Sequence, residues 1–450
     1  MNDRSDTIAA IATPPGKGAI AIVRVSGPQA RALASRLFRS RRPLRNRYAA
    51  YGTIVDECGV AIDRGLALWY DAPHGYTGED ALELHLHGSP VVAREVVRAL
   101  IAAGARAARP GEFTRRAFLN GKLDLTAAAA VADLIDAESR SAARAALANL
   151  GGGLAEHVRA LRARLAAIVE ELAAAIDFPD EVPGPDPTAL RHGVETIASE
   201  LRQLQRDGET GRLVREGVRV AIVGPPNAGK SSLLNALLGE ERALVSEVPG
   251  TTRDTIEESI VVRGAVVRLV DTAGIRAHAD RLEAAGIERT RRALAGARVV
   301  LVVVDGSQPL SRQARAVLRE TEDRVRVVFY NKADLGDAGA REPSPGEVVV
   351  GSTRDGATLR ALTDAIARVG WGGEMPDLER PHLASAREFE AVGAALHALS
   401  RAVATLSAGD PVDMIVGELQ CAFAELGHAS ADAANEEILE GIFARFCIGK

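Results

Sequence analysis

The pattern of apolar positions first predicts a compact α+β region. Over roughly the first 120 residues, short apolar runs alternate with Gly and Pro turns. The runs predict strands at 20–25 and 66–70 and a helix at 91–103. Alanine, the best helix former, then dominates from 126 to 176. This part is expected to form helices interrupted at Gly151–Gly153.

The helical region continues with an amphipathic pattern. Between Leu154 and Ile176, apolar residues recur at spacings of three and four, which is typical of one face of a bundle helix. Prolines at and after Pro179 end this helix, and a further helix is predicted at 190–205.

From Val218 onward, apolar strands alternate with helices. Strands that are apolar on both faces predict a parallel sheet covered by helices. They are expected at 218–223, 266–270, 299–304, 325–330 and 348–350. A Gly- and Pro-rich stretch then leads back to a helical pattern at 384–450.

Helical sequence therefore flanks the α/β region on both sides, which indicates an insertion. The predicted fold class is multidomain, with an α+β N-terminal domain, an α-helical bundle domain and an inserted α/β domain. The expected boundaries are 1–121 for the first domain, 122–214 with 377–450 for the discontinuous helical domain, and 215–376 for the inserted domain.

Composition excludes a disordered or fibrous chain, because 47% of the 450 residues are hydrophobic and 26% are charged. The net charge of -5 excludes a global polycation, but the charge is uneven. Residues 1–50 hold ten Lys or Arg and two Asp, whereas 409–450 hold two basic and eight acidic residues. A run of arginines with no acid in its span could steer the phosphates of a nucleic acid or form a solvated face. These arginines are Arg31, Arg36, Arg39, Arg41, Arg42, Arg45 and Arg47.

Three cysteines, Cys58, Cys421 and Cys447, provide neither a disulfide framework nor zinc-binding spacing. The N-terminus lacks a secretory pattern, and no apolar run approaches the ~18 residues of a membrane helix. A cytoplasmic protein with no membrane partner is therefore expected.

The sequence Gly224–Ser231 matches the phosphate-loop pattern G-x-x-x-x-G-K-[ST], between a predicted strand and a helix at 232–238. Its glycines allow backbone N–H groups to surround phosphate oxygens. Lys230 is expected to contact the β- and γ-phosphates, and the Ser231 hydroxyl to bind Mg²⁺.

Three further motifs follow predicted strands of the same sheet. Asp271–Gly274 is suited to Mg²⁺ and the γ-phosphate, and Ser352–Arg354 lies where a base-contacting loop is expected. In Asn331–Asp334, the Asp334 carboxylate can accept hydrogen bonds from N1–H and the 2-amino group of guanine. Adenine lacks this donor pair, so Asp334 favours guanine. The four motifs together predict a P-loop protein that binds guanine nucleotides.

The residue after Gly274 is Ile275, which cannot orient the attacking water as a Gln does in many GTPases. His278, Asp280 and Glu283 are polar alternatives in the following segment. The chemistry of the residues alone leaves the choice among them open.

Several motifs together resemble one family. Gly250–Asp254 is similar to the switch I signature of the TrmE-Era-EngA-like GTPases. The chain further resembles the MnmE (TrmE) family of tRNA modification GTPases from about residue 7 to 450. That resemblance is carried by Ala12–Gly16, Tyr76–Asp80, Arg109–Phe113, Ala117–Asp124 and Phe446–Lys450.

The resemblance implies a folate-binding N-terminal domain that forms homodimers, a discontinuous helical domain and an inserted G domain. It also implies a flavoprotein partner, MnmG (GidA), and an aminomethyl or carboxymethylaminomethyl product at C5 of the wobble uridine of certain tRNAs. The one-carbon unit would come from a 5-formyl or methylene form of tetrahydrofolate. The positions that match the folate contacts are Arg24, Glu83, Lys122 and Lys450, and Cys447 matches a cysteine with a possible role in the modification.

In the G domain, the resemblance assigns Ser231 and Thr252 to Mg²⁺. It assigns Asn227, Ser246, Val248 and Thr251 to a K⁺ ion, which would offset developing negative charge when two G domains pair. Glu283 matches the glutamate that positions water, so Glu283 and Lys230 are the predicted catalytic residues. The predicted GTP-binding residues are Asn227, Ala228, Gly229, Lys230, Ser231, Ser232, Ser246, Thr251, Thr252, Asp271, Thr272, Ala273, Gly274, Asn331, Lys332, Asp334, Ser352, Thr353 and Arg354.

The chain departs from the family pattern at 85–90, at Pro249 and at 427–431. A ribosome-assembly GTPase of the Era or EngA type is the alternative function, since it shares the switch sequence. The flanks disfavour it, because they carry neither a second GTPase module nor a Gly-x-x-Gly RNA loop. A purely structural scaffold would not need an intact phosphate loop.

Overall fold

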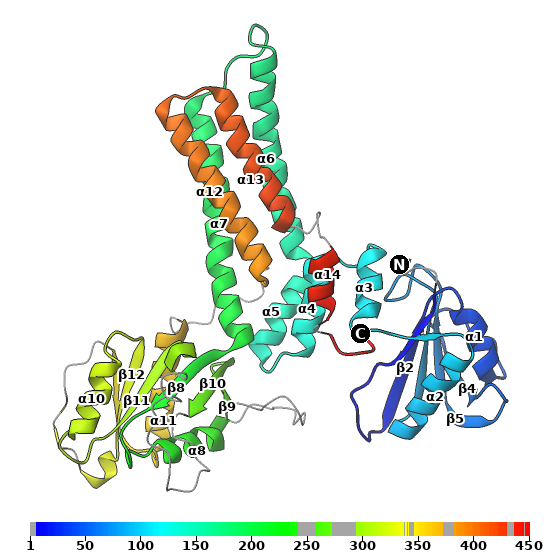
Figure 1. Cartoon of the computed structure of the whole chain (residues 1–450), viewed down its shortest axis with the longest axis horizontal. Helices are drawn as coiled ribbons and strands as arrows, with labels where there is room; N and C mark the ends of the chain where they lie inside the picture. The colour runs from blue at the N-terminus through cyan, green and yellow to red at the C-terminus, as the bar shows by residue number, and fades with distance from the viewer. Residues whose placement is uncertain are drawn as a thin grey trace. The chain divides into compact units, whose positions relative to one another are not determined.

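The computed structural model divides the chain into two compact units (Figure 1). Unit 1 comprises Met1–Ala132, Leu150–Arg162 and Leu426–Lys450, and unit 2 comprises Asp133–Asn149 and Ala163–Glu425. The structure describes residues 6–241, 257–271, 294–336, 338–339, 341, 346–371, 382–429, 436–444 and 446–450.

Unit 1 is built on a seven-stranded sheet with strand order β3-β4-β5-β6-β2-β1-β7. Among the described strands of this sheet, β1 and β7 pair in parallel and all the other pairs are antiparallel. The strands are β1 (Ile8–Ile11), β2 (Ile20–Ser26), β3 (Phe38–Ser40), β4 (Ala49–Val55), β5 (Ala61–Tyr70), β6 (Ala81–His87) and β7 (Arg106–Ala107).

The two faces of this sheet differ. Helices α1 (Ala30–Leu37) and α2 (Pro90–Ala102) cover one face, where Leu33 and Val96 from the helices pack in the same apolar cluster as Trp69 from β5. The alternating strand positions on the other face carry Arg24, Tyr51, Arg64 and Glu83. Polar chemistry therefore gathers on the face that α1 and α2 leave open.

The remaining helices of unit 1 join residues from both ends of the chain. Leu125 and Ala128 pack with Leu439, Phe443 and Phe446 in one apolar cluster. Figure 1 shows α14 beside α3, and the two helices are in contact. The helices are α3 (Glu112–Leu119), α4 (Leu125–Ile135) and α14 (Glu436–Phe443).

Unit 2 holds a six-stranded sheet with order β13-β12-β11-β8-β10-β9. Both faces are buried: Val299, Leu301 and Val303 pack under α8 and α11, whereas Val300 and Val302 face α10. This confirms the predicted α/β domain. The strands are β8 (Val218–Val223), β9 (Glu257–Val262), β10 (Ala265–Asp271), β11 (Val299–Asp305), β12 (Arg326–Asn331) and β13 (Glu347–Val350), and the helices are α8 (Lys230–Glu241), α10 (Arg312–Glu320) and α11 (Gly356–Trp371).

The five predicted strands pair in parallel, as expected, but the sheet has a sixth strand that the apolar runs did not predict. Edge strand β9 pairs antiparallel with β10. Arg263 and Gly264 join the two strands, and both have positive φ angles, 49° and 87°. Two-residue hairpin turns of this conformation match the twist of antiparallel strands. The sequence analysis predicted no strand at 257–262, so it missed this hairpin.

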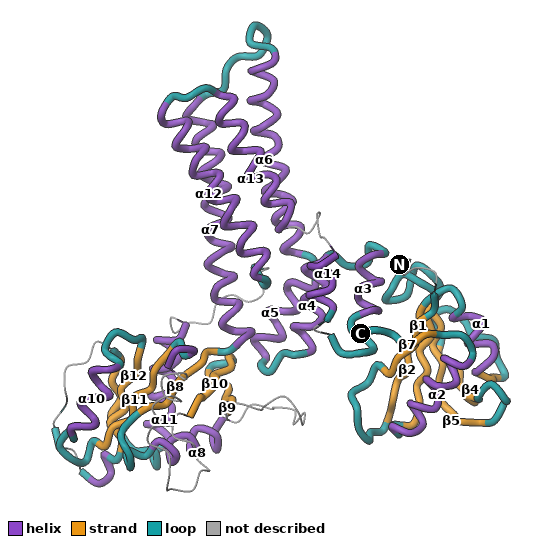
Figure 2. The backbone as a smooth tube through the Cα atoms, viewed as in Figure 1, coloured by secondary structure: helices purple, strands orange, loops and turns teal. Residues whose placement is uncertain are grey.

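Long helices are present, as the alanine-rich sequence and the amphipathic stripe predicted (Figure 2). Most of their length belongs to unit 2, whereas residues 153–162 and 426–429 belong to unit 1. Asp186 caps the N-terminus of α7, with Pro187 in its first turn, and Gly217 ends it directly before β8. A Ser385–Glu388 capping box starts α12. The helices are α5 (Arg140–Leu150), α6 (Gly153–Asp177), α7 (Pro187–Glu216), α12 (Ala386–Ala408) and α13 (Val412–Ala429).

Among the described helices, α12 is the one whose length and apolar composition would allow it to cross a membrane. It packs against α7 and buries Val392, Ala395 and Leu399. Buried core helices have the same composition, so this feature is weak evidence for a membrane span.

Candidate functional site

The phosphate loop of unit 2 is shaped by close backbone approach. After β8, Gly224 has φ of 154°, and a Cβ there would lie 2.1 Å from the Val303 carbonyl oxygen. Gly229 has φ of 97°, and its Cβ would lie 2.3 Å from Asn331 Nδ2. Only glycine fits these two places. The loop therefore keeps a cradle that suits phosphate oxygens at the start of α8.

Lys230 begins α8 and folds back over the loop. Its ammonium donates to the carbonyl oxygens of Gly224 at 2.9 Å and Pro225 at 2.8 Å. Asn227, predicted to bind GTP and K⁺, has φ of 61° at the tip of the loop. Ser231 and Ser232 lie in the first turn of α8, where helix N–H groups and dipole favour an anion.

Asn331 links three loops of the predicted nucleotide site. Its Nδ2 donates to the carbonyl of Ala228 in the phosphate loop at 3.0 Å. Its Oδ1 accepts from the backbone N–H of Lys332 at 2.8 Å and of Thr353 at 3.1 Å. Because Asn331 is buried, these bonds hold the loops after β8, β12 and β13 together.

The predicted base-recognition residues lie at this junction. Asp334 is in a short 3-10 turn, Ala333–Leu335, and its carboxylate is 3.4 Å from an Arg354 guanidinium nitrogen. Ser352 accepts from the Arg354 backbone N–H at 3.2 Å. The structure thus brings together the motifs Asn331–Asp334 and Ser352–Arg354, and the Asp334 side chain is partly exposed.

Sequence reasoning missed Asp305, which ends β11. Its carboxylate pairs with the Lys332 ammonium at 2.6 Å. Burial acts to raise the pKa of Asp305, but bonds from Lys332 and Ser307 outweigh it and leave the pKa lowered. Asp305 ends an apolar strand just as Asn331 does, so its position at the end of a predicted strand could have identified it as a candidate site residue.

Much of the predicted metal and switch chemistry lies outside the described residues. For Asp271, the structure gives only the backbone at the end of β10. No cluster of three metal-ligating His, Cys, Asp or Glu side chains occurs within the described ranges. The predicted residues outside them are Ser246, Val248, Thr251, Thr252, Thr272, Ala273, Gly274 and Glu283.

A second site lies on the open face of the sheet in unit 1. Arg24 on β2 stands directly opposite Glu83 on β6, and Arg24 Nε donates to Glu83 Oε1 at 2.9 Å. The Arg24 guanidinium also lies over the rings of Tyr76 and Phe113, 5.5 and 5.7 Å from their centres. Tyr70 donates its hydroxyl to Glu83 Oε2 at 3.5 Å.

A pocket of about 140 Å³ opens beside this pair. It is lined by Arg24, Ser26, Tyr70, Tyr76, Thr77, Ala81 and Glu83. Two of the four predicted folate residues therefore line one pocket. Sequence reasoning did not assign Tyr70, Tyr76 or Phe113, although Tyr76 and Phe113 belong to motifs that carry the family resemblance.

The C-terminal residues reach the same region. The Lys450 carbonyl accepts from the backbone N–H of Phe113 at 3.2 Å. Burial and then the nearby Arg24 charge lower the pKa of the Lys450 ammonium, while Glu83 opposes them. Lys122 packs its side chain toward Gly78, beyond the pocket lining. Cys447 is exposed.

Two family models match the chain. The model described as "GTP-binding protein TrmE N-terminus" matches residues 7–122, and "MnmE helical domain" matches 125–447. A protein named tRNA modification GTPase MnmE from Chloroflexus aurantiacus is 42% identical over 453 residues, covering 99% of this chain and 100% of that protein. The Aquifex aeolicus protein of the same name is 40% identical over 448 residues, with 99% and 100% covered.

Solved GTPases match part of the chain. Era from Aquifex aeolicus is 26% identical, with 40% of this chain and 66% of that chain covered and a TM-score of 0.27. The G domain of the FeoB iron transporter from T. maritima is also 26% identical, with 34% and 98% covered and a TM-score of 0.25. The full-length relatives, with 39–43% identity, are decisive. This chain belongs to the MnmE family of tRNA modification GTPases and is a GTP hydrolase.

Proposed function

We propose that this protein couples GTP hydrolysis to modification of the wobble uridine of certain tRNAs. The observation that carries the nucleotide site is the convergence at Asn331, which ties the phosphate loop to the two base-recognition loops. In this arrangement Asp334 selects guanine, and the glycine cradle before α8 receives the phosphates.

Hydrolysis rests mainly on electrostatic stabilisation. Lys230 exchanges its two loop carbonyls for phosphate oxygens when GTP binds, and Ser231 with Thr252 holds Mg²⁺. Asn227, Ser246, Val248 and Thr251 would hold K⁺, which would offset the negative charge that develops on the phosphates. Glu283 orients the attacking water in the absence of a Gln after Gly274.

The open face of unit 1 is the folate site in this proposal. Glu83 offers a carboxylate to the N–H donors of a pterin ring, and Arg24, Lys122 and Lys450 are the other residues proposed to contact the folate. The bound tetrahydrofolate, in its 5-formyl or methylene form, supplies the one-carbon unit. Cys447 is a candidate for a role in the modification chemistry.

Partners and organisation complete the proposal. The protein works in the cytoplasm as a homodimer with the flavoprotein MnmG, and the product carries an aminomethyl or carboxymethylaminomethyl group at C5 of the uridine. The domains span 1–121, then 122–214 with 377–450, and 215–376 for the inserted G domain. The family-model boundaries near 122 and 125 support the first division.

Steady-state GTP hydrolysis in matched KCl and NaCl buffers tests the K⁺ and Glu283 assignments. We expect the wild-type rate to rise steeply in KCl, and Glu283→Ala to lose about 100-fold or more, the order of one catalytic acid–base or water-positioning group. Glu288→Ala, which removes the same charge five positions on, is the matched control and should retain the rate. Equal rates in both salts would contradict the K⁺ site. An unchanged rate in Glu283→Ala would contradict the catalytic role of Glu283.

A further inference from the structure

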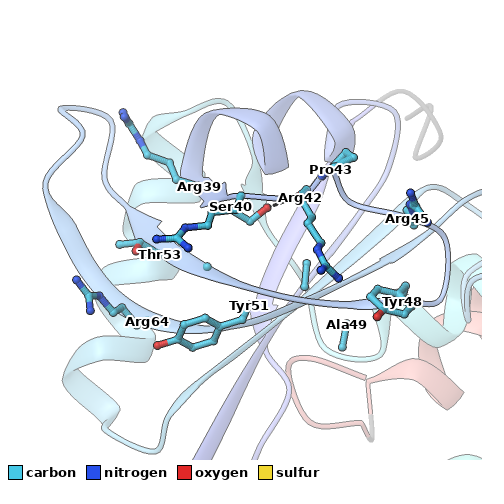
Figure 3. Close-up of a pocket in the computed structure, with 13 residues that line it drawn as sticks. Arg39, Ser40, Arg42, Pro43, Arg45, Tyr48, Ala49, Tyr51, Thr53 and Arg64 are labelled. Atoms are coloured by element: carbon cyan, nitrogen blue, oxygen red, sulfur yellow. Dashed lines mark hydrogen bonds between the residues drawn. The ribbon is translucent and has the colours of Figure 1, made fainter.

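The open face of unit 1 carries a second concave feature, which we name the arginine groove. It has a volume of about 1020 Å³ and lies over β3, β4 and the loop between them (Figure 3). Its wall includes Arg39, Arg41, Arg42, Arg45 and Arg64 together with Tyr48 and Tyr51. No acidic residue lines it. The groove therefore concentrates positive charge without neutralising it.

The loop that carries these arginines is firmly built. The Arg47 backbone N–H donates to the Trp69 carbonyl at 2.8 Å, and the Asn46 side chain accepts from the Asp71 N–H at 3.2 Å. The Tyr48 N–H donates to the Arg45 carbonyl at 3.1 Å, and Ser40 donates to the Arg42 carbonyl. These bonds fix the loop to the end of β5 and hold its side chains over β4.

The arginine-rich sequence segment separates into two groups. Arg31 pairs with Asp71 at 2.7 Å and lies over the Trp69 ring, and Arg36 donates to the Ala103 carbonyl at 3.0 Å. Arg47 donates to the His74 carbonyl at 3.3 Å. These three act within the fold. The arginines that line the groove are the remaining four of the segment, joined by Arg64.

Aromatic rings stand among those charges. Tyr48 is 57% exposed and Tyr51 is 67% exposed, and Tyr51 lies on the same strand face as Thr53, whose neighbour across the sheet is Arg64. Guanidinium groups that meet phosphates, interleaved with exposed rings that stack on bases, are the features by which proteins bind unpaired RNA. A duplex would present its phosphates but not its base faces to the tyrosines.

We propose that the arginine groove binds an unpaired loop of the tRNA, with the arginines on its phosphates and Tyr48 and Tyr51 against its bases. This inference rests on the proposed tRNA substrate and names the surface that holds it. The register supports it: Ala49, on the groove wall, is three strands across from Arg24 through Leu68 and Glu83. At the usual strand spacing this is roughly 15 Å. A nucleotide bound at the Ala49 side of the groove would thus lie about 15 Å from the proposed folate pocket.

Binding of a fluorescein-labelled tRNA transcript to the full chain, followed by anisotropy over a KCl series, tests the proposal. Arg42→Gln/Arg45→Gln should weaken binding about tenfold at low salt and reduce the salt slope by about one to two. Arg94→Gln/Arg98→Gln on α2 removes the same charge from exposed positions on the covered side of the sheet and should leave both unchanged. Tyr48→Ala/Tyr51→Ala should weaken a hairpin-loop RNA several-fold but leave a blunt duplex unaffected.

The outcomes separate this inference from the proposed function. If the wild-type chain binds tRNA and the groove variants bind it equally well, the groove proposal is wrong and the tRNA substrate stands. If the wild-type chain does not bind tRNA, both fail. If the groove variants keep tRNA binding but shift sedimentation from dimer to monomer, the surface is an interface with a second copy. Fluorescent GDP affinity, unchanged in every variant, verifies that the G domain is intact.

Discussion

At the scale of single residues, the nucleotide site depends on two positions that have no side chain. The phosphate loop passes so close to β11 and to Asn331 that the absence of a side chain at Gly224 and Gly229 is a structural requirement. Both glycines adopt a backbone conformation that other residues avoid. The absence of a Cβ also leaves room for the Val303 carbonyl and the Asn331 amide. The motif is thus a packing constraint as well as a ligand-binding pattern.

Gly224→Ala should therefore damage the site. The added Cβ would lie 2.1 Å from the Val303 oxygen, and the φ angle of 154° disfavours any side chain. We expect a loss of about 1–3 kcal/mol in G-domain stability and at least tenfold weaker binding of fluorescent GDP. Gly239→Ala, in open space on α8, is the control and should be neutral or slightly stabilising. Wild-type affinity in Gly224→Ala would contradict the close approach to β11.

At the scale of elements, α3 is held to the edge of the unit 1 sheet by a buried ionic network. Glu112 begins α3 and is 3% exposed. It accepts from Arg106 at 2.6 Å, from Arg116 at 3.2 Å and from the Arg109 N–H at 2.7 Å. Burial acts to raise the pKa of Glu112, but the bonds from Arg106 and the Arg109 N–H outweigh it, so the pKa is lowered. Arg116 and Arg106 also pair with Asp6, next to β1.

The stability of unit 1 should consequently depend on pH through Glu112. A lowered folded pKa means that its contribution is complete above the unfolded value of 4.5 and is lost as the pH falls through the folded pKa. Glu112→Gln should cost on the order of 3 kcal/mol at pH 7, with the difference from wild type shrinking below about pH 4.5. Thermal melts followed by Trp69 fluorescence in a Trp371→Phe background measure it. Glu95→Gln, exposed on α2, should have a negligible effect, and a pH-independent Glu112→Gln deficit would contradict the charge argument.

The same scale shows what a sequence can predict. Strands 218–223 and 299–304 were predictable because burial on both faces leaves a continuous apolar run. β4 escaped prediction because Ala, Gly and Tyr alternate there, and one face is open. α7 extends well past the predicted helix 190–205, although Gly208 and Gly211 lower the helix propensity there. Both glycines lie where the segment at His382 and Leu383 packs too closely for a side chain, a contact that the local sequence does not show. The phosphate loop is local in sequence, whereas the Arg24–Glu83 pair depends on strand register.

At the scale of the whole molecule, the two proposed ligand sites depend on different parts of the chain. All the described elements of the nucleotide site lie between Val218 and Trp371, within unit 2. The pocket of unit 1 is lined by residues of β2, β5 and β6 and of the 76–77 loop, and the last residue of the chain lies near enough for the charges of Arg24 and Glu83 to act on the Lys450 ammonium. Ile448 forms a bridge with Pro110, and a Cβ on Gly449 would lie 2.2 Å from the Ile11 oxygen. The C-terminus is thereby part of the N-terminal sheet region.

Removal of Ile448–Lys450 should separate the two functions. It deletes the bridge to Pro110, the hydrogen bond from the Phe113 N–H and the ammonium beside Arg24 and Glu83. We expect 5-formyltetrahydrofolate binding, measured by calorimetry, to weaken at least tenfold, because a charge-assisted contact contributes about 1.5–3 kcal/mol. GTP hydrolysis in KCl should stay within about twofold of wild type, since RT ln 2 is only about 0.4 kcal/mol and every described residue of the nucleotide site remains.

Lys450→Met distinguishes the two contributions of the C-terminus. It keeps the backbone bridge and the bond from Phe113 but removes the positive charge, so it isolates the role of the ammonium. If Lys450→Met weakens folate binding as much as the deletion does, charge is decisive. If only the deletion weakens it, the backbone anchor shapes the pocket and Lys450 is not a ligand. Unchanged folate binding in both variants would contradict any contribution of the C-terminal residues to the folate site.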